Sequence, residues 1–381
     1  MINVKILFWR SVPMDVSIGD FEQFAKNWKD KIYVISYQGY PKERQQCGFS
    51  LKGIGNATEI VLSESSNPMK VAKKIIDKNY NCIHLFSGIR EHNQKILDYL
   101  IKKCKNLGAS PLVGVFSERP NMFGNRVEKM LRLFGYNILY HYLAKRYNKF
   151  ISAFLAMGGI GVDTYIRYGF SENIMFKYMY CPKLPQIDAK IKTAINEIKF
   201  LYVGRFNYVT KGLDILMNAF DKLEYDNWTL DIVGGYGDRK AEVINWCNTH
   251  DNVNFVGSWN NEEVCIKMRD YDVCVVPSRY DGWNLIPNQA IRSGIATIIT
   301  EEAGSDELIN ASGAGLVVKP EVDSFYHALE KVTAYPQICE EWKARALKYR
   351  DKISEEAVGD YFTQIIQYAF LGNSRKPSCP W

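Results

Sequence analysis

The sequence predicts an α/β protein made of two parallel-sheet domains, and three observations support this prediction. Short apolar runs rich in valine, isoleucine and aromatic residues alternate with amphipathic helical patterns along the chain, as is typical of βαβ units. With 381 residues, the chain is too long for one ordinary hydrophobic core. A polar, lysine-rich stretch follows the CPKLP sequence at 181–185 and divides the chain into two halves.

Composition narrows the class of protein. Hydrophobic residues make up 47% and charged residues 24% of the chain, as in ordinary globular proteins. The formal charge of +6 permits an anionic ligand or an anionic membrane surface, but it requires neither and indicates no nucleic-acid partner. Nine cysteines without C-x-x-C pairs favour reduced thiols in a cytosolic protein that has no zinc site.

In the first half, apolar runs predict six strands, with helical patterns between most of them. The expected strands are Val4–Trp9, Lys31–Tyr37, Glu59–Leu62, Cys82–Phe86, Leu112–Phe116 and Phe150–Met157, and the expected helices include Phe21–Trp28, Met69–Lys78 and Asn93–Lys105. The glycines of GGIG at 158–161 follow the sixth strand. Because the G-x-G-x-x-G order is absent, we interpret them as a tight strand-to-helix turn and not as a phosphate loop.

The second half repeats the alternation. The expected strands are Lys199–Val203, Trp228–Val233, Val253–Phe255, Val273–Val276, Ala296–Thr300 and Val317–Val318, and the expected helices are Leu213–Lys222, Glu242–Asn248, Glu262–Asp270, a long region from Ser324 onward, and Glu355–Leu371. These patterns place the domains at 1–182 and 199–354, the linker at 183–198 and a final helical piece at 355–381.

The stretch PSRYDGWNLIPNQAI at 277–291 predicts a ligand site. A buried strand ends there, a loop with Asp281 and Gly282 follows, and Pro287 is suited to the first turn of a helix. In open α/β sheets, ligands bind where strands end and helices begin, and the helix dipole favours anions. The alternative is an ordinary βα loop with a structural aspartate.

A second segment, GRFNYVTKG at 204–212, carries two cations beside a glycine turn. Arg205 and Lys211 follow the end of an expected strand, where they can neutralise a pyrophosphate through charge-assisted hydrogen bonds. Taken alone, an arginine and a lysine that flank a turn are better explained as solvated surface residues, and only the order of the other segments favours the ligand site.

In their order and spacing, these segments resemble retaining glycosyltransferases of family 4, which belong to the glycosyl transferases group 1 and have the GT-B fold. GRFNYVTKG is similar to the family's G-R-L-x-x-x-K-G segment with one extra residue, and 277–291 keeps the E-x7-E spacing with Asp281 and Gln289. DIVGGYG at 231–237 resembles the family's strand and glycine turn near the nucleotide, and EEAGSDELI at 301–309 its loop at the donor phosphates. The resemblance covers about residues 199–320.

The resemblance implies two Rossmann-like domains that face each other across a cleft, with the final helix crossing back to the N-terminal domain. It also implies roles for residues. Arg205 and Lys211 would grip the donor diphosphate, Asp281 would hold hydroxyls of the transferred sugar, and Gln289 would bind the ribose. The remaining implied contacts to the donor are Gly204, Gly234, Gly235, Asn288, Gly304 and Ser305. We expect no metal and no cofactor, because GT-B enzymes generally need no metal and the nucleotide sugar is a substrate.

The acceptor should lie against the N-terminal domain, at the carboxyl ends of its strands. The candidates there are Arg10, Ser87, Gly88, Glu118 and Arg119. Glu118 is the best carboxylate to position or deprotonate an acceptor hydroxyl, although a salt bridge with Arg119 is an equal alternative. His84 and His92 are interpreted as ordinary packing or surface histidines.

The segment Arg126–Lys149 is helical, aromatic-rich and basic, a combination typical of helices that lie on anionic membranes. A helix packed on the sheet with lysines that extend outward is the alternative. No apolar run approaches the roughly 20 residues that span a bilayer, and residues 1–10 read as a strand and not as a signal peptide. We therefore expect a cytoplasmic protein that at most lies on the inner face of a membrane.

The sequence thus predicts a retaining, metal-independent hexosyltransferase. It would move a sugar from a nucleotide diphosphate-sugar to a saccharide or lipid-linked saccharide, in the synthesis of a surface polysaccharide or glycolipid. Two alternatives remain open at this point: a GT-B sugar-nucleotide epimerase, and a non-catalytic subunit that binds a sugar nucleotide or a polysaccharide. The replacement of the usual glutamates by Asp281 and Gln289 motivates the second.

Overall fold

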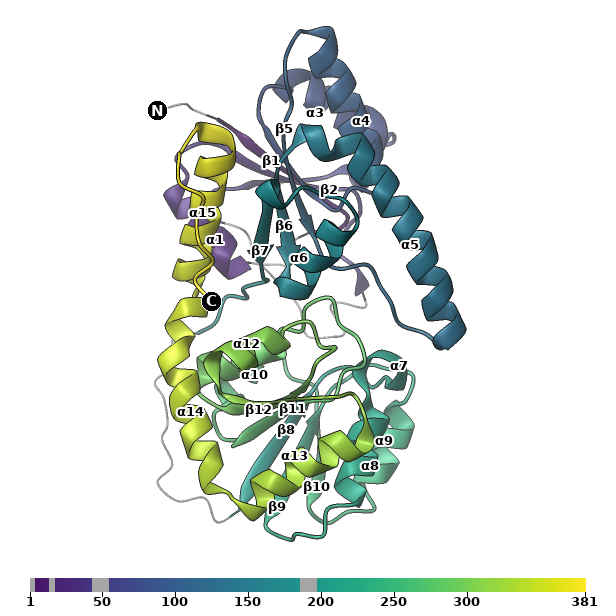
Figure 1. The fold of residues 1–381 in the computed structure, drawn as a ribbon, viewed down its shortest axis with the longest axis vertical. Helices are drawn as coiled ribbons and strands as arrows, with labels where there is room; N and C mark the ends of the chain where they lie inside the picture. Colours follow the sequence, from purple (N-terminus) through teal and green to yellow (C-terminus); the bar gives the residue numbers. More distant parts are fainter. Residues whose placement is uncertain (1–3, 14–17, 43–54, 186–196) are drawn as a thin grey trace.

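The computed structural model describes residues 4–13, 18–42, 55–185 and 197–381. Two parallel sheets, each covered by helices, are stacked along the long axis of the molecule (Figure 1). The strand β7 belongs to the first sheet and β8 to the second, so the chain passes between them through the predicted linker. Most of that linker, 186–196, lies outside the described residues.

The first sheet has seven strands in the order β3-β2-β1-β4-β5-β6-β7, and all of its pairs are parallel. The strands are β1 Ile6–Arg10, β2 Ile32–Ser36, β3 Thr58–Val61, β4 Ile83–Ser87, β5 Leu112–Ser117, β6 Ile151–Met157 and β7 Met175–Tyr178. The helices are α1 Ile18–Asn27, α3 Pro68–Asn79, α4 Glu91–Asn106, α5 Arg126–Tyr147 and α6 Gly158–Arg167, and the short 3-10 helices are η1 Leu62–Glu64, η2 Asn148–Phe150 and η3 Glu172–Ile174. The six predicted strands are confirmed, and β7 was missed.

The second sheet has six strands in the order β10-β9-β8-β11-β12-β13, again all parallel. The strands are β8 Ile198–Val203, β9 Trp228–Val233, β10 Val253–Gly257, β11 Val273–Val276, β12 Ala296–Thr300 and β13 Gly315–Val318. The helices are α7 Tyr208–Lys211, α8 Leu213–Asp221, α9 Lys240–Cys247, α10 Asn261–Met268, α11 Ile286–Ser293, α12 Asp306–Ser312, α13 Val322–Ala334, α14 Gln337–Tyr349 and α15 Glu355–Leu371, with the 3-10 helix η4 Arg350–Ile353 before α15. The predicted strands of this half are confirmed.

The last helix, α15, leaves the second sheet and packs against α1 of the first (Figure 1). Its start is held by an ion pair between Arg292 and Glu355, with 2.7 Å between Nη2 and Oε2. Further along, Phe362 is fully buried, and its ring lies 4.5 Å from that of Phe24, centroid to centroid. The rings of Phe8, Phe21, Phe116 and Tyr178 also lie within 6.1 Å of Phe362. One residue of α15 therefore completes an aromatic core in the N-terminal domain.

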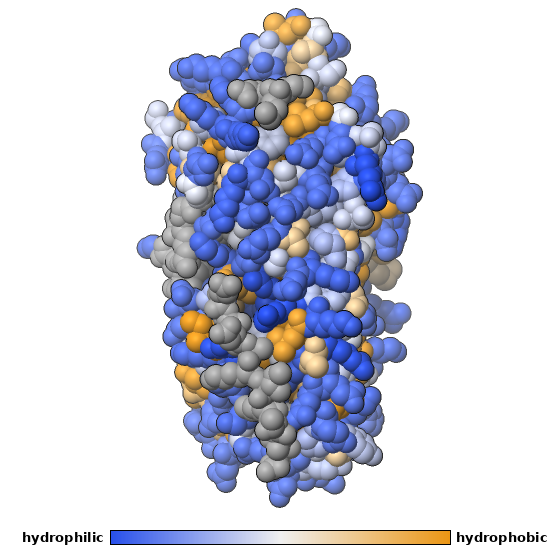
Figure 2. All heavy atoms as spheres, turned by 90° about the vertical axis from the view of Figure 1, so that its left-hand side faces the viewer, coloured by the Kyte–Doolittle hydropathy of each residue, from blue (hydrophilic) through white to orange (hydrophobic). Residues whose placement is uncertain are grey.

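Figure 2 shows the side of the molecule that α14 and α15 cover, and this face is mainly hydrophilic with scattered apolar residues. Across the described residues, no helix is both long enough and apolar enough to cross a bilayer. Of the nine cysteines in the sequence, eight lie in described positions, and none of these eight is paired in a disulfide.

The contact between α15 and α1 is close enough to require a glycine. A Cβ at Gly359 would lie 2.6 Å from the Cβ of Gln23 and 2.7 Å from the Asp20 carbonyl oxygen, whereas one at Gly135 of α5 would meet open space. We therefore predict that Gly359→Ala lowers the free energy of unfolding by about 1–3 kcal/mol through overpacking. Gly135→Ala is the control, and it should raise stability by about 0.5–1 kcal/mol through helix propensity alone. Urea unfolding measures the free energy of unfolding of both variants. Equal changes in the two variants would contradict the close contact between α15 and α1.

Candidate functional site

A cleft of about 1050 Å³ opens between the two sheets, at the carboxyl ends of their strands. Both domains line it, which is the arrangement that the sequence predicts. Most of the predicted site residues lie in its wall: Arg10, Ser87, Gly88, Glu118, Arg119, Gly204, Arg205, Lys211, Gly234, Gly235, Asp281 and Gln289. Asn288, Gly304 and Ser305 are not among the lining residues.

The short helix α7 places Lys211 in the cleft. Asn207 caps this helix by accepting a hydrogen bond from the Thr210 backbone N–H. Gly212 ends it with a positive φ of 63°, and a Cβ there would overlap the Pro277 carbonyl. The extra residue in this loop, compared with the family pattern, is thus accommodated in one helical turn packed against the end of β11.

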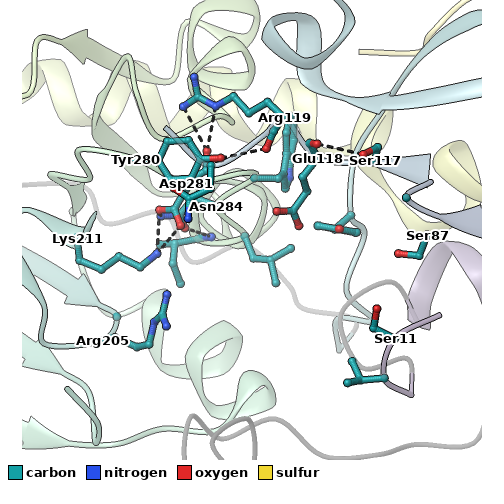
Figure 3. Close-up of a pocket in the computed structure, with 18 of the residues that line it drawn as sticks. Ser11, Ser87, Ser117, Glu118, Arg119, Arg205, Lys211, Tyr280, Asp281 and Asn284 are labelled. Atoms are coloured by element: carbon teal, nitrogen blue, oxygen red, sulfur yellow. Dashed lines mark hydrogen bonds and ion pairs between the residues drawn. The ribbon is translucent and has the colours of Figure 1, made fainter. Parts of the chain in front are cut away.

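Lys211 forms an ion pair with Asp281. Its Nζ lies 2.8 Å from both carboxylate oxygens, and Asn284 Nδ2 donates a further hydrogen bond of 2.9 Å to Oδ2 (Figure 3). The side chains of Lys211 and Asp281 are only 15% and 16% exposed. Asp281 is therefore held in one position, and its carboxylate neutralises one of the two cations that the sequence assigns to a diphosphate.

Arg119 holds the Asp281 loop from the opposite domain. Its Nε and Nη2 donate to the Asp281 carbonyl oxygen at 3.3 Å, and Nη2 also donates to the Glu302 carbonyl at 2.8 Å. The guanidinium forms an ion pair with Glu302 and lies over the ring of Tyr280, 4.8 Å from its centroid. Tyr280 in turn donates its hydroxyl to the Arg119 carbonyl (Figure 3). Arg119, which the sequence predicts on the acceptor side, therefore forms a bridge between the domains in this structure.

Glu118 lies in the middle of the cleft. A Cβ on Gly282 would overlap the Glu118 carboxylate, so this side chain reaches the loop that carries Asp281. Its backbone carbonyl accepts a hydrogen bond of 2.6 Å from the Tyr165 hydroxyl, which fixes the end of β5. Figure 3 shows the Glu118 side chain between Asp281 on one side and Ser87 on the other.

Arg205 points into the same part of the cleft as Lys211 (Figure 3). Within the described part of the chain, its guanidinium has no ion-pair partner, whereas the ammonium group of Lys211 is paired with Asp281. The loop that carries it is pressed against the loop after β9, because a Cβ on Gly234 would overlap the Gly204 carbonyl. The glycines at the ends of β8 and β9 thus let the two neighbouring loops approach each other beside the Arg205 guanidinium.

Gln289 and Asn288 lie in the first turns of α11, but their side chains point in different directions. Gln289 borders the cleft, donates from Nε2 to Asn261 Oδ1 at 3.2 Å, and keeps a buried Oε1 without a hydrogen-bond partner among the described residues. Asn288 is buried away from the cleft, where it accepts from Trp283 Nε1 and donates to the Tyr180 carbonyl. The amide of Asn288 is thus engaged with Trp283 and Tyr180, and its assistance to Gln289 at a ligand stays a prediction.

Gly304 and Ser305 lie behind the Asp281 loop. Gly304 has φ of 77°, and a Cβ there would lie 2.9 Å from the Asp281 carbonyl oxygen. Ser305 is fully buried. Gly158 meets the same region from the N-terminal domain, since its Cβ would lie 2.9 Å from the Trp283 ring. The GGIG turn leads directly from β6 into α6, as interpreted from the sequence, and it also packs against the other domain.

The two histidines behave differently from each other. His84 is fully buried, accepts from the Trp9 indole N–H through Nδ1, and therefore carries its proton on Nε2, 2.9 Å from the Asn79 carbonyl. Burial lowers its pKa to about 4, so it stays neutral and structural. His92 lies in the cleft wall, stacked on Tyr37 with 5.0 Å between ring centroids.

Sequence reasoning missed several residues of the site. Asn284, Asn261 and Tyr280 touch predicted site residues but are common loop residues without a distinctive spacing. Glu91 lines the cleft at the start of α4 with φ of 55°, a conformation that is rare for a residue other than glycine. Among the described residues, no group of His, Cys, Asp or Glu side chains is placed to hold a metal ion.

A known protein family matches the second half of the chain, which carries most of the residues of the cleft wall described above. Residues 185–349 match the family Glycosyl transferases group 1. This match supports a group 1 glycosyltransferase, and it includes Arg205, Lys211, Asp281 and Gln289. The first half of the chain lies outside it.

Two curated relatives match shorter parts of the chain. A protein of the cps region of Klebsiella pneumoniae, itself uncharacterised, is 29% identical over 122 residues, which are 32% of this chain and 33% of that protein. An uncharacterised glycosyltransferase of Methanocaldococcus jannaschii is 28% identical over 142 residues, or 36% of each chain. The chain thus matches about a third of the length of these relatives.

Solved structures resemble the whole molecule. Sucrose-phosphate synthase of Thermosynechococcus elongatus has a TM-score of 0.67 at 16% identity, covering 97% of this chain and 100% of that one. Anabaena HepE in complex with UDP has a TM-score of 0.71 at 12% identity, covering 96% and 100%. At these identities the likeness shows the fold. Together with the two parallel sheets, it confirms the predicted GT-B architecture of two Rossmann-like domains.

The bridge made by Arg119 can be tested directly. Arg119→Lys keeps the charge but cannot reproduce the fork of hydrogen bonds to the Asp281 and Glu302 carbonyls. We predict that amide hydrogen exchange in 280–284 and 302–305 becomes about tenfold faster, since charge-assisted bonds contribute roughly 1.5–3 kcal/mol. Arg345→Lys, at an exposed pair with Glu341, is the matched control and should change nothing there. Unaltered exchange in Arg119→Lys would exclude the bridge.

Proposed function

We propose that this protein is a retaining glycosyltransferase that takes its sugar from a nucleotide diphosphate-sugar and needs no bound metal. The observation that carries the proposal is the convergence of Arg205, Lys211 and Asp281 at one side of the interdomain cleft, inside the region that matches group 1. UDP bound to the similar Anabaena HepE is in keeping with a nucleotide as ligand.

The two cations suit a diphosphate leaving group. When the bond to the sugar breaks, negative charge develops on the diphosphate, and positive groups fixed near it lower the barrier. Arg205 offers a guanidinium that can bind two phosphate oxygens at once, and Lys211 offers a point charge. These side chains supply the charge that a metal ion supplies in other transferases.

The ion pair of Lys211 implies an exchange of partners when the donor binds. The diphosphate competes with Asp281 for Nζ, and a lysine that turns to the phosphate leaves the Asp281 carboxylate with hydrogen-bond acceptors to fill. Hydroxyls of the transferred sugar are suitable donors for them. Asn284 keeps its hydrogen bond of 2.9 Å to Oδ2 and so holds the carboxylate in place during the exchange.

Gln289 is suited to the ribose. Its Oε1 is a buried acceptor without a partner among the described residues, and leaving such an atom unsatisfied costs free energy. Because this oxygen has almost no exposed surface, the amide must turn toward the cleft before a ribose hydroxyl can donate to it, and Asn261 then loses its hydrogen bond from Nε2. Gly204, Gly234 and Gly235 line the cleft at the ends of β8 and β9, beside the position that we propose for the nucleotide.

The acceptor is a saccharide, free or linked to a lipid, on the N-terminal side of the cleft. Glu118 lies between the Asp281 loop and Ser87, where it can orient or deprotonate an acceptor hydroxyl (Figure 3). Tyr37, Ser87 and Asn93 also border this side, so polar residues contribute to its wall. A hydroxyl-rich molecule is the ligand class that fits such a wall.

A second function, isomerisation of the donor without an acceptor, is motivated by Glu91 and His92. Both line the cleft beside Glu118, so the site holds more titratable groups than the sequence indicated. Mass spectrometry after incubation with a panel of UDP-, GDP- and ADP-sugars, with and without EDTA, separates the outcomes. Transfer or donor hydrolysis that survives EDTA supports the proposed function, an isomerised donor supports the second, and an unchanged donor indicates a binding subunit.

The cations give a first prediction for binding. Arg205→Ala and Lys211→Ala should each weaken binding of a nucleoside diphosphate by about 10- to 100-fold, because each removes charge-assisted hydrogen bonds of roughly 1.5–3 kcal/mol. Lys222→Ala is the control, since this lysine pairs with Asp323 on an exposed surface. Calorimetry gives the affinities and thermal unfolding shows that the variants are folded. Unchanged affinity in both site variants would overturn the assignment.

We predict that substitutions at Asp281 mainly change the turnover rate, whereas substitutions at Gln289 mainly change the affinity for the donor. Asp281→Asn should spare binding of the free nucleoside diphosphate but lower kcat by about tenfold or more, because the lost contact to the sugar strengthens in the transition state. Gln289→Ala should raise the KM for the donor with a smaller effect on kcat. Gln289→Glu should be tolerated. Full turnover in Asp281→Asn, or loss of donor binding in Gln289→Glu, would show that these residues do not have the proposed roles.

A further inference from the structure

The helix α5 has two apolar faces, and the fold uses one of them. The buried residues of α5 are Tyr140, Leu143, Ala144 and Tyr147, which pack on the N-terminal domain. A second stripe lies about half a helical turn away and recurs every three or four residues. Its members are Val127, Met130, Leu131, Phe134, Ile138 and Tyr142, and each is at least 50% exposed. The sequence-based alternative of one packed face with extended lysines does not account for this stripe.

An exposed stripe of this length is unusual on a soluble protein. Phe134 and Leu131 are each 68% exposed, and they lie one turn apart on the helix. Scattered apolar residues on a surface need no explanation, but contiguous ones mark an interaction site. The face that carries α14 and α15, by contrast, is mainly hydrophilic (Figure 2). Among the described residues, seven of the fifteen exposed large hydrophobic side chains belong to α5.

Charge indicates what covers the stripe. The helix also carries exposed cations, with Lys145 in line with the stripe and Arg126 and Lys129 on other sides of its first turns. The acidic residue of α5, Glu128, is engaged in the capping box with Asn125. A second copy of the chain would bring two such basic helices together, which like-charge repulsion opposes. An anionic lipid surface offers both the apolar and the negatively charged partner.

The position of α5 relates the stripe to the cleft. The loop that enters α5 begins with Glu118 and Arg119 in the cleft wall. Arg132 lies over the ring of Phe123 in that loop, and Phe123 lies 6.4 Å from Tyr280, measured between ring centroids. Figure 1 shows the first turns of α5 projecting beside the second domain. A surface in contact with these turns would therefore border the acceptor side of the cleft.

We propose that α5 docks this protein on an anionic membrane surface, with its exposed apolar stripe in the interface and its lysines and arginines at the lipid headgroups. The interaction is peripheral and reversible. It rests on α5 alone and does not depend on the proposed function, although a lipid-linked acceptor would then be presented at the mouth of the cleft.

Sedimentation with lipid vesicles tests the proposal. The full chain should sediment with phosphatidylglycerol-containing vesicles at low salt, bind phosphatidylcholine vesicles much less, and lose affinity in 1 M salt, where the screening length falls to about 3 Å. Leu131→Ser/Phe134→Ser should weaken binding at least about tenfold, because two apolar side chains leave the interface. Lys129→Gln/Lys145→Gln should weaken binding to the anionic vesicles alone.

Matched controls come from exposed residues elsewhere. Leu107→Ser/Tyr335→Ser removes two exposed apolar side chains, and Lys222→Gln/Lys348→Gln removes two exposed lysines, so neither should change vesicle binding. Thermal unfolding checks that the α5 variants remain folded. The proposal is overturned by absence of binding at low salt, or by binding that the α5 variants and the controls alter equally. It is also overturned if sedimentation velocity shows a dimer that Leu131→Ser/Phe134→Ser dissociates, which would make the stripe an interface between copies.

Discussion

The ion pair between Lys211 and Asp281 is the interaction around which the cleft is arranged. Each partner stands at the end of a different strand, Lys211 after β8 and Asp281 after β11, and these two strands are neighbours in the sheet. The loops bring them to 2.8 Å because Gly212 allows α7 to pack on Pro277. Arg279 strengthens this contact by donating its backbone N–H to the Thr210 carbonyl at 2.8 Å.

The same pair joins the two domains indirectly. The Asp281 carbonyl accepts from Arg119 of the N-terminal domain while its carboxylate accepts from Lys211. A ligand that draws Lys211 away changes the balance of charge in a loop that also carries the interdomain bridge. The position that we propose for the diphosphate and the Arg119 bridge between the domains are therefore connected through one short loop.

How far the sequence predicts this molecule depends on the kind of information that each feature needs. The runs Val273–Val276 and Ala296–Thr300 are predicted at their observed bounds, because buried central strands are continuous apolar segments. The edge strand β7 is four residues long and contains Lys177, so its pattern is too weak to find. Asp281 and Gln289 could be found from spacing. The opposite direction of Asn288 and the bridge of Arg119 depend on tertiary contacts that no local pattern encodes.

The position of Phe362 has a consequence for how the chain is made. This ring completes a core otherwise formed by residues between Phe8 and Tyr178, yet it is translated about half a chain length after them. A domain usually folds as it emerges from the ribosome. Here the N-terminal domain cannot complete its aromatic core beside α1 until the last helix has been synthesised. The domain that is synthesised first is therefore the last to complete its hydrophobic core. Until then, the aromatic residues that Phe362 covers in the folded protein lack this contact.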